Sequence, residues 1–114
     1  VSRQAMVNFL RRNPKAKHVL VSAVSDHSAL GAAAALKASR ICETSAVVGH
    51  DGDAEALREM SEANSPYLAT ISFFADRYGR ELVDLMTRIH RGESVSPAHY
   101  VDFEVIDRVK LQRR

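Results

Sequence analysis

Hydroxyl, carboxylate, imidazole and aromatic side chains follow three apolar runs of the chain. Ser25 and Asp26 come after the first run, His50-Asp51-Gly52 after the second, and Ser72-Phe73-Phe74 at the end of the third. If the runs are parallel strands, their carboxyl ends meet at one edge of a sheet, where such sheets bind ligands. Carboxylates accept hydrogen bonds from hydroxyls, and an aromatic ring covers the apolar face of a ring-shaped ligand. This set of groups suits a neutral, polyhydroxylated ligand.

Each of these residues also has a structural interpretation. Asp26 can cap the helix that follows, because its carboxylate can accept hydrogen bonds from free N–H groups of the first turn. Asp51 precedes a glycine and can be a turn former, but it lies nearest the strand end, and Asp53 is better placed to cap the next helix. We therefore place Asp51 in the binding site. Phe73 and Phe74 point to opposite faces of a strand, so we expect one in the core and the other as a platform for the ligand.

The spacings that typify enzymes and metal sites are missing from the sequence. It has no GxxxxGK phosphate loop, no GxSxG nucleophile turn and no GxGxxG spacing. The five histidines form no HExxH pair, and the run from Asp51 to Asp53 lacks the later ligands of a calcium loop. The single Cys42 is interpreted as a small buried residue. We expect no catalytic residue, metal or cofactor.

Helical and extended periods alternate along the chain, which predicts an α/β fold with a doubly wound parallel sheet. We expect the first strand to be central, because its apolar run hardly alternates with polar residues. The fourth strand alternates and fits an edge. The predicted helices are residues 3–12, 26–38, 54–62 and 76–91, and the predicted strands are residues 18–24, 45–50, 67–74 and 100–106.

Composition and charge fit one globular domain. The 114 residues are 46% hydrophobic and 26% charged, and the one cysteine cannot form a disulfide within the chain. The net charge is +2, with basic residues grouped in residues 1–18 and 108–114. We interpret these groups as solvated helix faces and expect no nucleic acid partner, because neither a helix-turn-helix pattern nor a basic stripe with aromatic residues accompanies them. The chain begins at Val1 rather than a methionine, so missing targeting signals say nothing about its compartment.

Four segments in a fixed order resemble a known family. They are AVSDHSALGAAAALKA (Ala23–Ala38), SAVVGHDG (Ser45–Gly52), SPYLATISFF (Ser65–Phe74) and DRYGRELVDLMTRIHRGESV (Asp76–Val95). Together they resemble the C-terminal part of type I periplasmic sugar-binding proteins of the ribose-binding kind. The effector domains of lactose-repressor-type regulators share that fold.

The resemblance implies a clamp of two lobes that closes on a sugar, and it implies which residues touch that sugar. They are the residue before the Asp of the first motif (Ser25), the Asp of the V-V-G-x-D motif (Asp51) and the third residue after the Thr of the T-I strand (Phe73). The family most often has an Asn at the first of these positions and an amide or other polar side chain at the third. Because Phe73 can stack but cannot hydrogen bond, the identity of the ligand is open.

The resemblance also divides the chain. Residues 1–74 would be a partial C-terminal ligand-binding lobe, residues 75–98 a hinge crossing with a helix of the first lobe, and residues 99–114 a return strand and tail. Without the rest of the first lobe, the apolar stripe of helix 76–91 lacks its natural neighbours, so we expect that helix to associate with another copy of the chain or to pack elsewhere.

Two functions follow from the resemblance. The first is capture of a sugar or polyol as the solute-binding component of an ABC transporter, in the periplasm and with a membrane permease as partner. The alternative is the effector-binding domain of a cytoplasmic lactose-repressor-type transcriptional regulator. An enzyme on the same fold is a third and weaker hypothesis.

Overall fold

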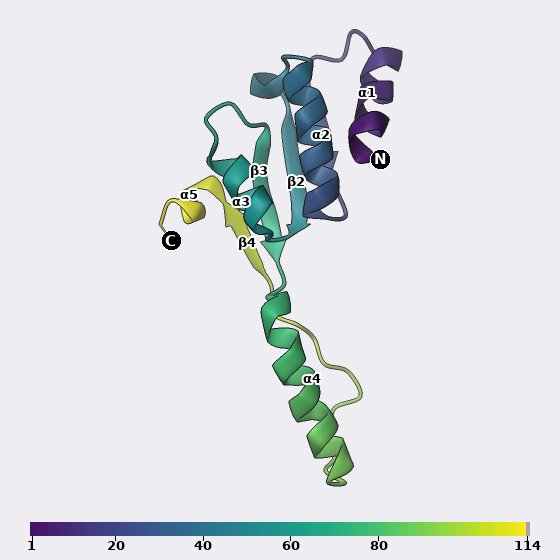
Figure 1. Ribbon diagram of the computed structural model, residues 1–114, viewed down its shortest axis with the longest axis vertical. Coiled ribbons are helices and arrows are strands. Elements are labelled where there is room, and N and C mark those ends of the chain that lie inside the picture. The colour runs from purple at the N-terminus through teal and green to yellow at the C-terminus, as the bar shows by residue number, and fades with distance from the viewer. Residues whose placement is uncertain (114) are drawn as a thin grey trace.

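A four-stranded sheet forms the body of the molecule, and one long helix projects from it (Figure 1). The computed structural model describes residues 1–113. The first two strand pairs are parallel, as predicted, and the last pair is antiparallel. In order across the sheet the strands are β1 (Leu20–Ser22), β2 (Ala46–Asp51), β3 (Tyr67–Ser72) and β4 (Glu104–Asp107).

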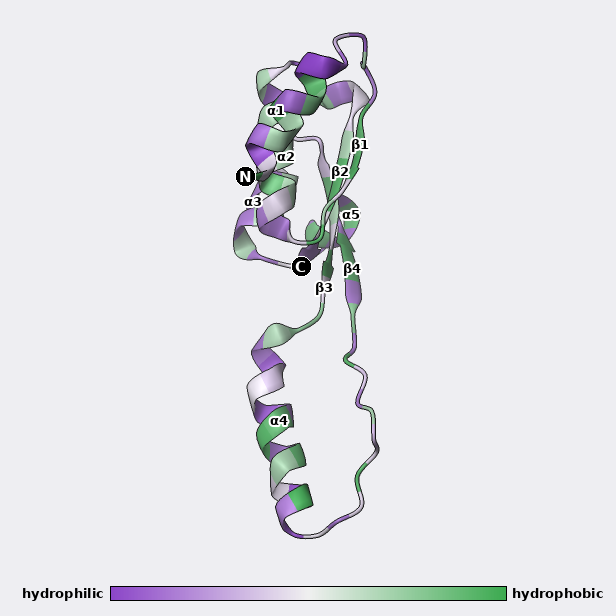
Figure 2. Ribbon diagram, turned by 90° about the vertical axis from the view of Figure 1, so that its right-hand side faces the viewer, coloured by the Kyte–Doolittle hydropathy of each residue, from purple (hydrophilic) through white to green (hydrophobic). Residues whose placement is uncertain are grey.

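Helices cover one face of this sheet. Helices α2 and α3 connect the parallel strands and lie on the same side, and α1 packs on the outside of α2 (Figure 2). The helices are α1 (Ser2–Arg12), α2 (Asp26–Ala38), α3 (Ala54–Ser61), α4 (Ala75–His90) and the short α5 (Arg108–Leu111), with a 3-10 turn, η1, at Cys42–Thr44. The α/β class with a mostly parallel sheet is confirmed.

The core lies between the helices and the sheet. Small side chains on α2, Ala29 and Ala33 among them, let the helix approach the strands closely. From the sheet, Val47, Tyr67 and Ile106 fill the same layer and are almost fully buried. The body therefore has one continuous apolar layer, which holds the carboxyl ends of the strands in place.

Several strand predictions are wrong in detail, including the end of the third strand, which stops at Ser72 rather than at residue 74. The first strand spans Leu20–Ser22 rather than residues 18–24, and it lies at the edge of the described sheet rather than at its centre. Leu20 is 80% exposed, and the helices cover only one face of the described sheet. The last strand spans Glu104–Asp107 instead of residues 100–106. Residues 100–103 form no regular secondary structure.

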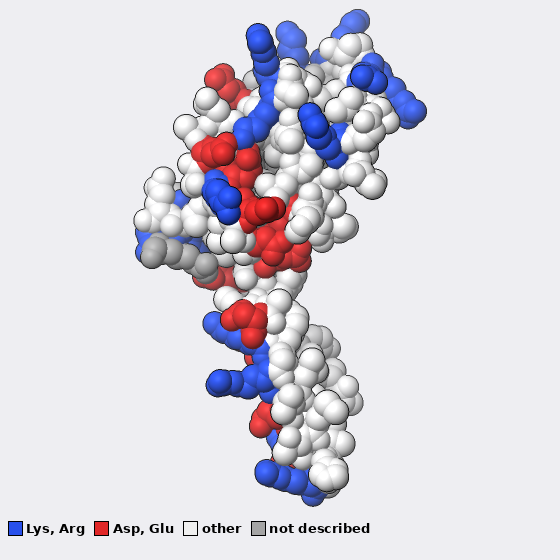
Figure 3. Space-filling model, in the orientation of Figure 1, with Lys and Arg blue, Asp and Glu red and all other residues white. Residues whose placement is uncertain are grey.

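Helix α4 projects from the sheet, and the molecule is 61 Å long as a result. Its charged side chains lie along one side (Figure 3). Three residues of the predicted apolar stripe, Leu82, Met86 and Ile89, are 58%, 68% and 54% exposed. Between residues 1 and 113, no helix is both long and apolar enough to cross a membrane. The division at residues 74 and 98 stays a prediction.

Candidate functional site

The carboxyl ends of the three parallel strands form one edge, and the predicted site residues lie along it. Asp51 ends β2 and pairs in register with Ser72 of β3, the residue before Phe73. On the other side, the backbone N–H of Asp26 donates to Oδ2 of Asp51 over 3.4 Å. The fold thus brings together residues from all three predicted places.

Asp51 is the exposed carboxylate of this edge. Its backbone has φ 124°, in the left-handed region that non-glycine residues rarely adopt, and Gly52 follows with φ 78°. One carboxylate oxygen, Oδ2, accepts the N–H at the start of α2. No group of residues 1–113 hydrogen bonds its Oδ1. Asp51 can therefore accept hydrogen bonds from ligand hydroxyls without breaking a contact of the fold.

Asp26 has a different role from both of those predicted for it. It is 0% exposed, and its carboxylate accepts three hydrogen bonds from within the protein. Oδ1 accepts from the hydroxyls of Tyr67 (2.7 Å) and Thr70 (2.6 Å), and Oδ2 accepts from the backbone N–H of Asp53 (2.8 Å). With no exposed surface, Asp26 neither caps α2 nor offers an oxygen to a ligand in this conformation.

Tyr67 and Thr70 are the partners that sequence reasoning missed. They are three residues apart in β3, so a regular strand would place them on opposite faces. The register between β2 and β3 shifts between Val47 and Val48, and both side chains reach Asp26. Burial, and then the hydrogen bond to Asp26, raise the pKa of Tyr67 well above its usual value, so its hydroxyl stays a donor.

Ser25, and not Asp26, caps α2 with its side chain, and the Asp53 side chain caps neither helix. Ser25 is the N-cap of α2: its Oγ accepts from the N–H of Ser28 over 3.3 Å and donates to Oγ of Ser28 over 3.2 Å. Asp53 stands at the N-cap position of α3, but its side chain makes no capping hydrogen bond and lies 3.5 Å from Nδ1 of His27. The predicted cap by Asp53 is wrong. Ser25 lies at the site's edge with its hydroxyl already engaged.

The aromatic residues form a pair beside Asp51. The rings of Phe73 and His50 are 6° from parallel, with centroids 6.2 Å apart. His50 Nδ1 lies 2.8 Å from the carbonyl oxygen of Ala23, which can only accept, so Nδ1 carries the proton. Both rings are half-buried, and the two residues directly adjoin the in-register pair Asp51 and Ser72 in the chain.

Phe74 is not a core residue either, which corrects the expectation that one of the two phenylalanines is buried. It adopts a left-handed conformation, φ 54°, at the start of α4. The guanidinium of Arg77 lies 4.2 Å from the centre of its ring. The turn from β3 into α4 interrupts the strand alternation on which the expectation rested.

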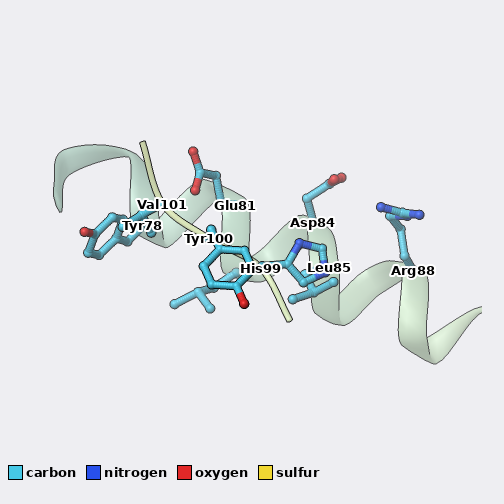
Figure 4. A pocket seen from close by; sticks show the side chains of 9 residues that line it. Tyr78, Glu81, Asp84, Leu85, Arg88, His99, Tyr100 and Val101 are labelled. Atoms are coloured by element: carbon cyan, nitrogen blue, oxygen red, sulfur yellow. The ribbon is translucent and has the colours of Figure 1, made fainter. Parts of the chain in front are cut away.

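A hollow lies away from this edge, between α4 and the returning chain. It measures about 370 Å³, and His99 and Tyr100 lie over the helix there, opposite Leu85 (Figure 4). Within residues 1–113, no cluster of three or more His, Cys, Asp or Glu residues could hold a metal ion.

Cys42 is half-buried, and burial raises the pKa of its thiol. Neither the hollow nor Cys42 includes any of the predicted site residues Ser25, Asp26, Asp51 and Phe73.

Comparisons with known proteins match the fold of solved structures. No protein-family model matches the chain, and no curated protein matches it. An ABC transporter solute-binding protein from Agrobacterium vitis, solved with bound allitol, has a TM-score of 0.90 and 21% identity. That match covers 98% of this chain and 39% of the other.

Two further structures agree with it. A periplasmic solute-binding protein of an ABC transporter from Actinobacillus succinogenes 130z, with bound D-allose, has a TM-score of 0.86 and 19% identity, over 99% of this chain and 39% of its own. A solute-binding protein from Mycobacterium smegmatis, with bound glycerol, has a TM-score of 0.83 and 28% identity, over 98% and 38%.

These matches confirm the predicted α/β fold and, separately, the resemblance to type I periplasmic sugar-binding proteins. The chain has the type I periplasmic-binding-protein fold, in the form found in ABC transporter solute-binding proteins that were solved with bound allitol, D-allose and glycerol. It spans less than two fifths of the length of the structures that it matches.

Proposed function

We propose that this chain forms one wall of a sugar or polyol site in the solute-binding component of an ABC transporter. The observation that carries the proposal is Asp51. Its carboxylate is exposed at the carboxyl edge of the sheet, with one oxygen held by the N–H of Asp26 and the other without a hydrogen-bond partner among residues 1–113. A fixed carboxylate with a free oxygen is the acceptor that a ligand rich in hydroxyls requires.

The rings of Phe73 and His50 indicate a second feature of the ligand, an apolar face. Phe73 offers only its ring, so it favours the apolar C–H face of a sugar over a further hydroxyl. The parallel ring of His50 extends that surface, and its Nδ1 is occupied by the Ala23 carbonyl. We infer a ligand that places hydroxyls toward Asp51 and a C–H face toward the two rings.

Helix α4 supports the two-lobed arrangement. It leaves the body at Phe74, and the chain returns to the sheet at Glu104, so two segments connect it to the lobe of residues 1–74. In the proposed clamp, α4 packs in the first lobe and its exposed residues Leu82, Met86 and Ile89 are covered there. The two connecting segments then form part of the hinge.

The proposed cellular role is solute delivery in the periplasm, to a membrane permease and without a chemical step. The compared structures support a transport receptor over a regulator, because each is described as a solute-binding protein of an ABC transporter. A sugar-responsive regulator is the outcome expected instead if a DNA-binding headpiece precedes this segment in the gene product.

Calorimetric titration of the full-length gene product tests the proposal. The probes are allitol, D-allose, ribose, glucose and glycerol, with amino acids as controls. We expect saturable binding of at least one sugar or polyol with a dissociation constant of about 10 μM or lower, worth roughly 7 kcal/mol. A gene product that binds none of these sugars and polyols contradicts the proposed function.

A further inference from the structure

We propose that Asp26 and Thr70 together act as a positioning device for Asp51, holding the turn of residues 51–53 in the conformation that presents the Asp51 carboxylate to hydroxyls. The inference rests on the proposed function of Asp51. It assigns to two buried residues a part in ligand affinity that is separate from their part in folding.

The turn needs to be held because its backbone is unusual. Asp51 has φ 124° and Gly52 has φ 78°, so two consecutive residues lie at positive φ. Glycine adopts such angles freely, but an aspartate does so only where the surrounding structure over-determines its conformation. Without contacts that hold it, the turn would adopt more favourable backbone angles, and the orientation of the Asp51 side chain would change.

Three consecutive residues of the turn are hydrogen-bonded to the same two residues, Asp26 and Thr70. The carboxylate of Asp51 accepts from the N–H of Asp26 over 3.4 Å. The N–H of Gly52 donates to Oγ1 of Thr70 over 3.3 Å, and the N–H of Asp53 donates to Oδ2 of Asp26 over 2.8 Å. Thr70 in turn donates to Oδ1 of Asp26 over 2.6 Å. The turn therefore cannot shift without breaking several hydrogen bonds at once.

Both members of the device are almost fully buried, which fixes their own positions. Asp26 is 0% exposed and Thr70 is 1% exposed. Gly49 makes room for the Asp26 carboxylate and the Tyr67 hydroxyl bonded to it, because a Cβ at that position would overlap both groups. Rotamers locked by packing transmit their position to the turn, which is what a positioning residue requires.

Tyr67 is the control position that distinguishes a role in positioning the turn from a role in folding. Its hydroxyl donates to Oδ1 of the same carboxylate over 2.7 Å, so its loss destabilises the same buried group. Yet it makes no hydrogen bond to residues 51–53 in the part of the chain described. Thr70→Val and Tyr67→Phe each delete one hydroxyl bonded to Asp26, and only the first releases the turn.

The test compares these two variants in the full-length gene product, with allitol and D-allose as probes. We expect Thr70→Val to raise the dissociation constant about tenfold or more, since one aligned hydrogen bond is worth about that factor. We expect Tyr67→Phe to lower the unfolding midpoint while changing the dissociation constant by less than about twofold. Thr70→Ser, which keeps the hydroxyl, should restore parental affinity.

Amide hydrogen exchange gives a second readout that needs no ligand. The Gly52 N–H should exchange much faster in Thr70→Val than in the parent, while the amides of β2 and β3 keep their protection. In Tyr67→Phe, Gly52 should follow the rest of the sheet. Equal affinity loss in both variants, or unchanged Gly52 exchange in Thr70→Val, would overturn the positioning role.

The outcomes also separate this inference from the proposed function. In an Asp51→Ala background, Thr70→Val should cause no further loss of affinity, because the group that it positions is gone. If Asp51→Ala abolishes binding but Thr70→Val binds like the parent, the positioning role fails and the site stands. If the parent binds neither these two probes nor any other sugar or polyol, the proposed function fails, and the exchange of Gly52 still decides whether Thr70 holds the turn.

Discussion

Asp26 and Asp51 meet at the edge of the sheet, although 25 residues separate them: the backbone N–H of Asp26 donates to Oδ2 of Asp51. The two aspartates have opposite roles. The Asp26 carboxylate is fully buried and accepts three hydrogen bonds inside the protein, whereas the Asp51 carboxylate is exposed. One fixes the edge of the sheet, and the other is available to a ligand.

Because the Tyr67 hydroxyl is buried, we expect the protein to lose stability at alkaline pH. Burial, and then the hydrogen bond to Asp26, raise the pKa of the hydroxyl above the ordinary value of 10.0. The unfolded chain loses this proton near pH 10 while the folded protein keeps it, so the free energy of unfolding is unaffected below about pH 9 and falls as the pH rises above about 10. Each proton contributes a slope of about 1.4 kcal/mol per pH unit.

Urea unfolding of the parent and Tyr67→Phe between pH 8.5 and 11 measures this slope. Lys37 adds a decline of the same sign in both proteins, because its hydrogen bond with Glu59 raises its pKa. In Tyr67→Phe the free energy of unfolding should therefore fall less steeply with pH than in the parent. The two slopes should differ by the contribution of about one proton, roughly 1.4 kcal/mol per pH unit. Parallel curves for the two proteins would contradict the account.

Ser25 should contribute to the stability of α2 as its N-cap. Ser25→Ala removes the acceptor of the Ser28 N–H and should lower the free energy of unfolding by about 1 kcal/mol. Ser28→Ala is the matched control, because it keeps that N–H and removes only the second hydroxyl; it should cost less than about 0.5 kcal/mol. The expectation fails if the two variants are equally stable.

Most of the fold could be predicted from local patterns. The boundaries of α2 and the parallel pairing of the first three strands follow from an alanine-rich helical period between apolar strands. The central position of the first strand could not be predicted from its apolar character. Leu20 and Val24 look like buried residues in the sequence, but they are 80% and 88% exposed, and Val24 lies beyond the end of β1.

Of the site, the place of Asp51 could be predicted from the sequence, but the role of Asp26 could not. Asp51 follows from the rule that parallel sheets bind ligands beyond their carboxyl ends. The role of Asp26 depends on Tyr67 and Thr70, which are distant in sequence and share a face only because the register between β2 and β3 shifts. Alternation alone would have separated them.

The exposed stripe of α4 predicts self-association of the 114-residue chain when it is alone. Leu82, Met86 and Ile89 together expose enough apolar surface to drive pairing at high concentration. Sedimentation should show dimers or larger species, and Met86→Glu should shift them toward monomer. The control is Glu81→Gln, which removes one charge from the same helix and leaves Leu82, Met86 and Ile89 unchanged. A parent chain that stays monomeric at millimolar concentration would contradict this.

The 114-residue chain alone should bind sugar weakly. A clamp surrounds its ligand, and one wall leaves the other face of the ligand in water, without the partner hydrogen bonds. Losing about half of roughly 8 kcal/mol moves a dissociation constant from about micromolar toward millimolar. Titration of the isolated chain with pentoses, hexoses and polyols checks this. A saturable micromolar complex would show that the chain needs no second lobe.

The most direct measurement is the affinity of Asp51→Ala against that of Asp53→Ala in the full-length gene product, by calorimetry with the sugar or polyol that the parent binds. Both variants delete an aspartate side chain from the same turn, but only Asp51 has its carboxylate at the strand end with a free oxygen, while the Asp53 side chain makes no capping hydrogen bond. Asp51→Ala should weaken binding by about 2–4 kcal/mol, and Asp53→Ala by less than about 0.5 kcal/mol. Parental affinity in Asp51→Ala would contradict the central claim that this carboxylate binds the ligand.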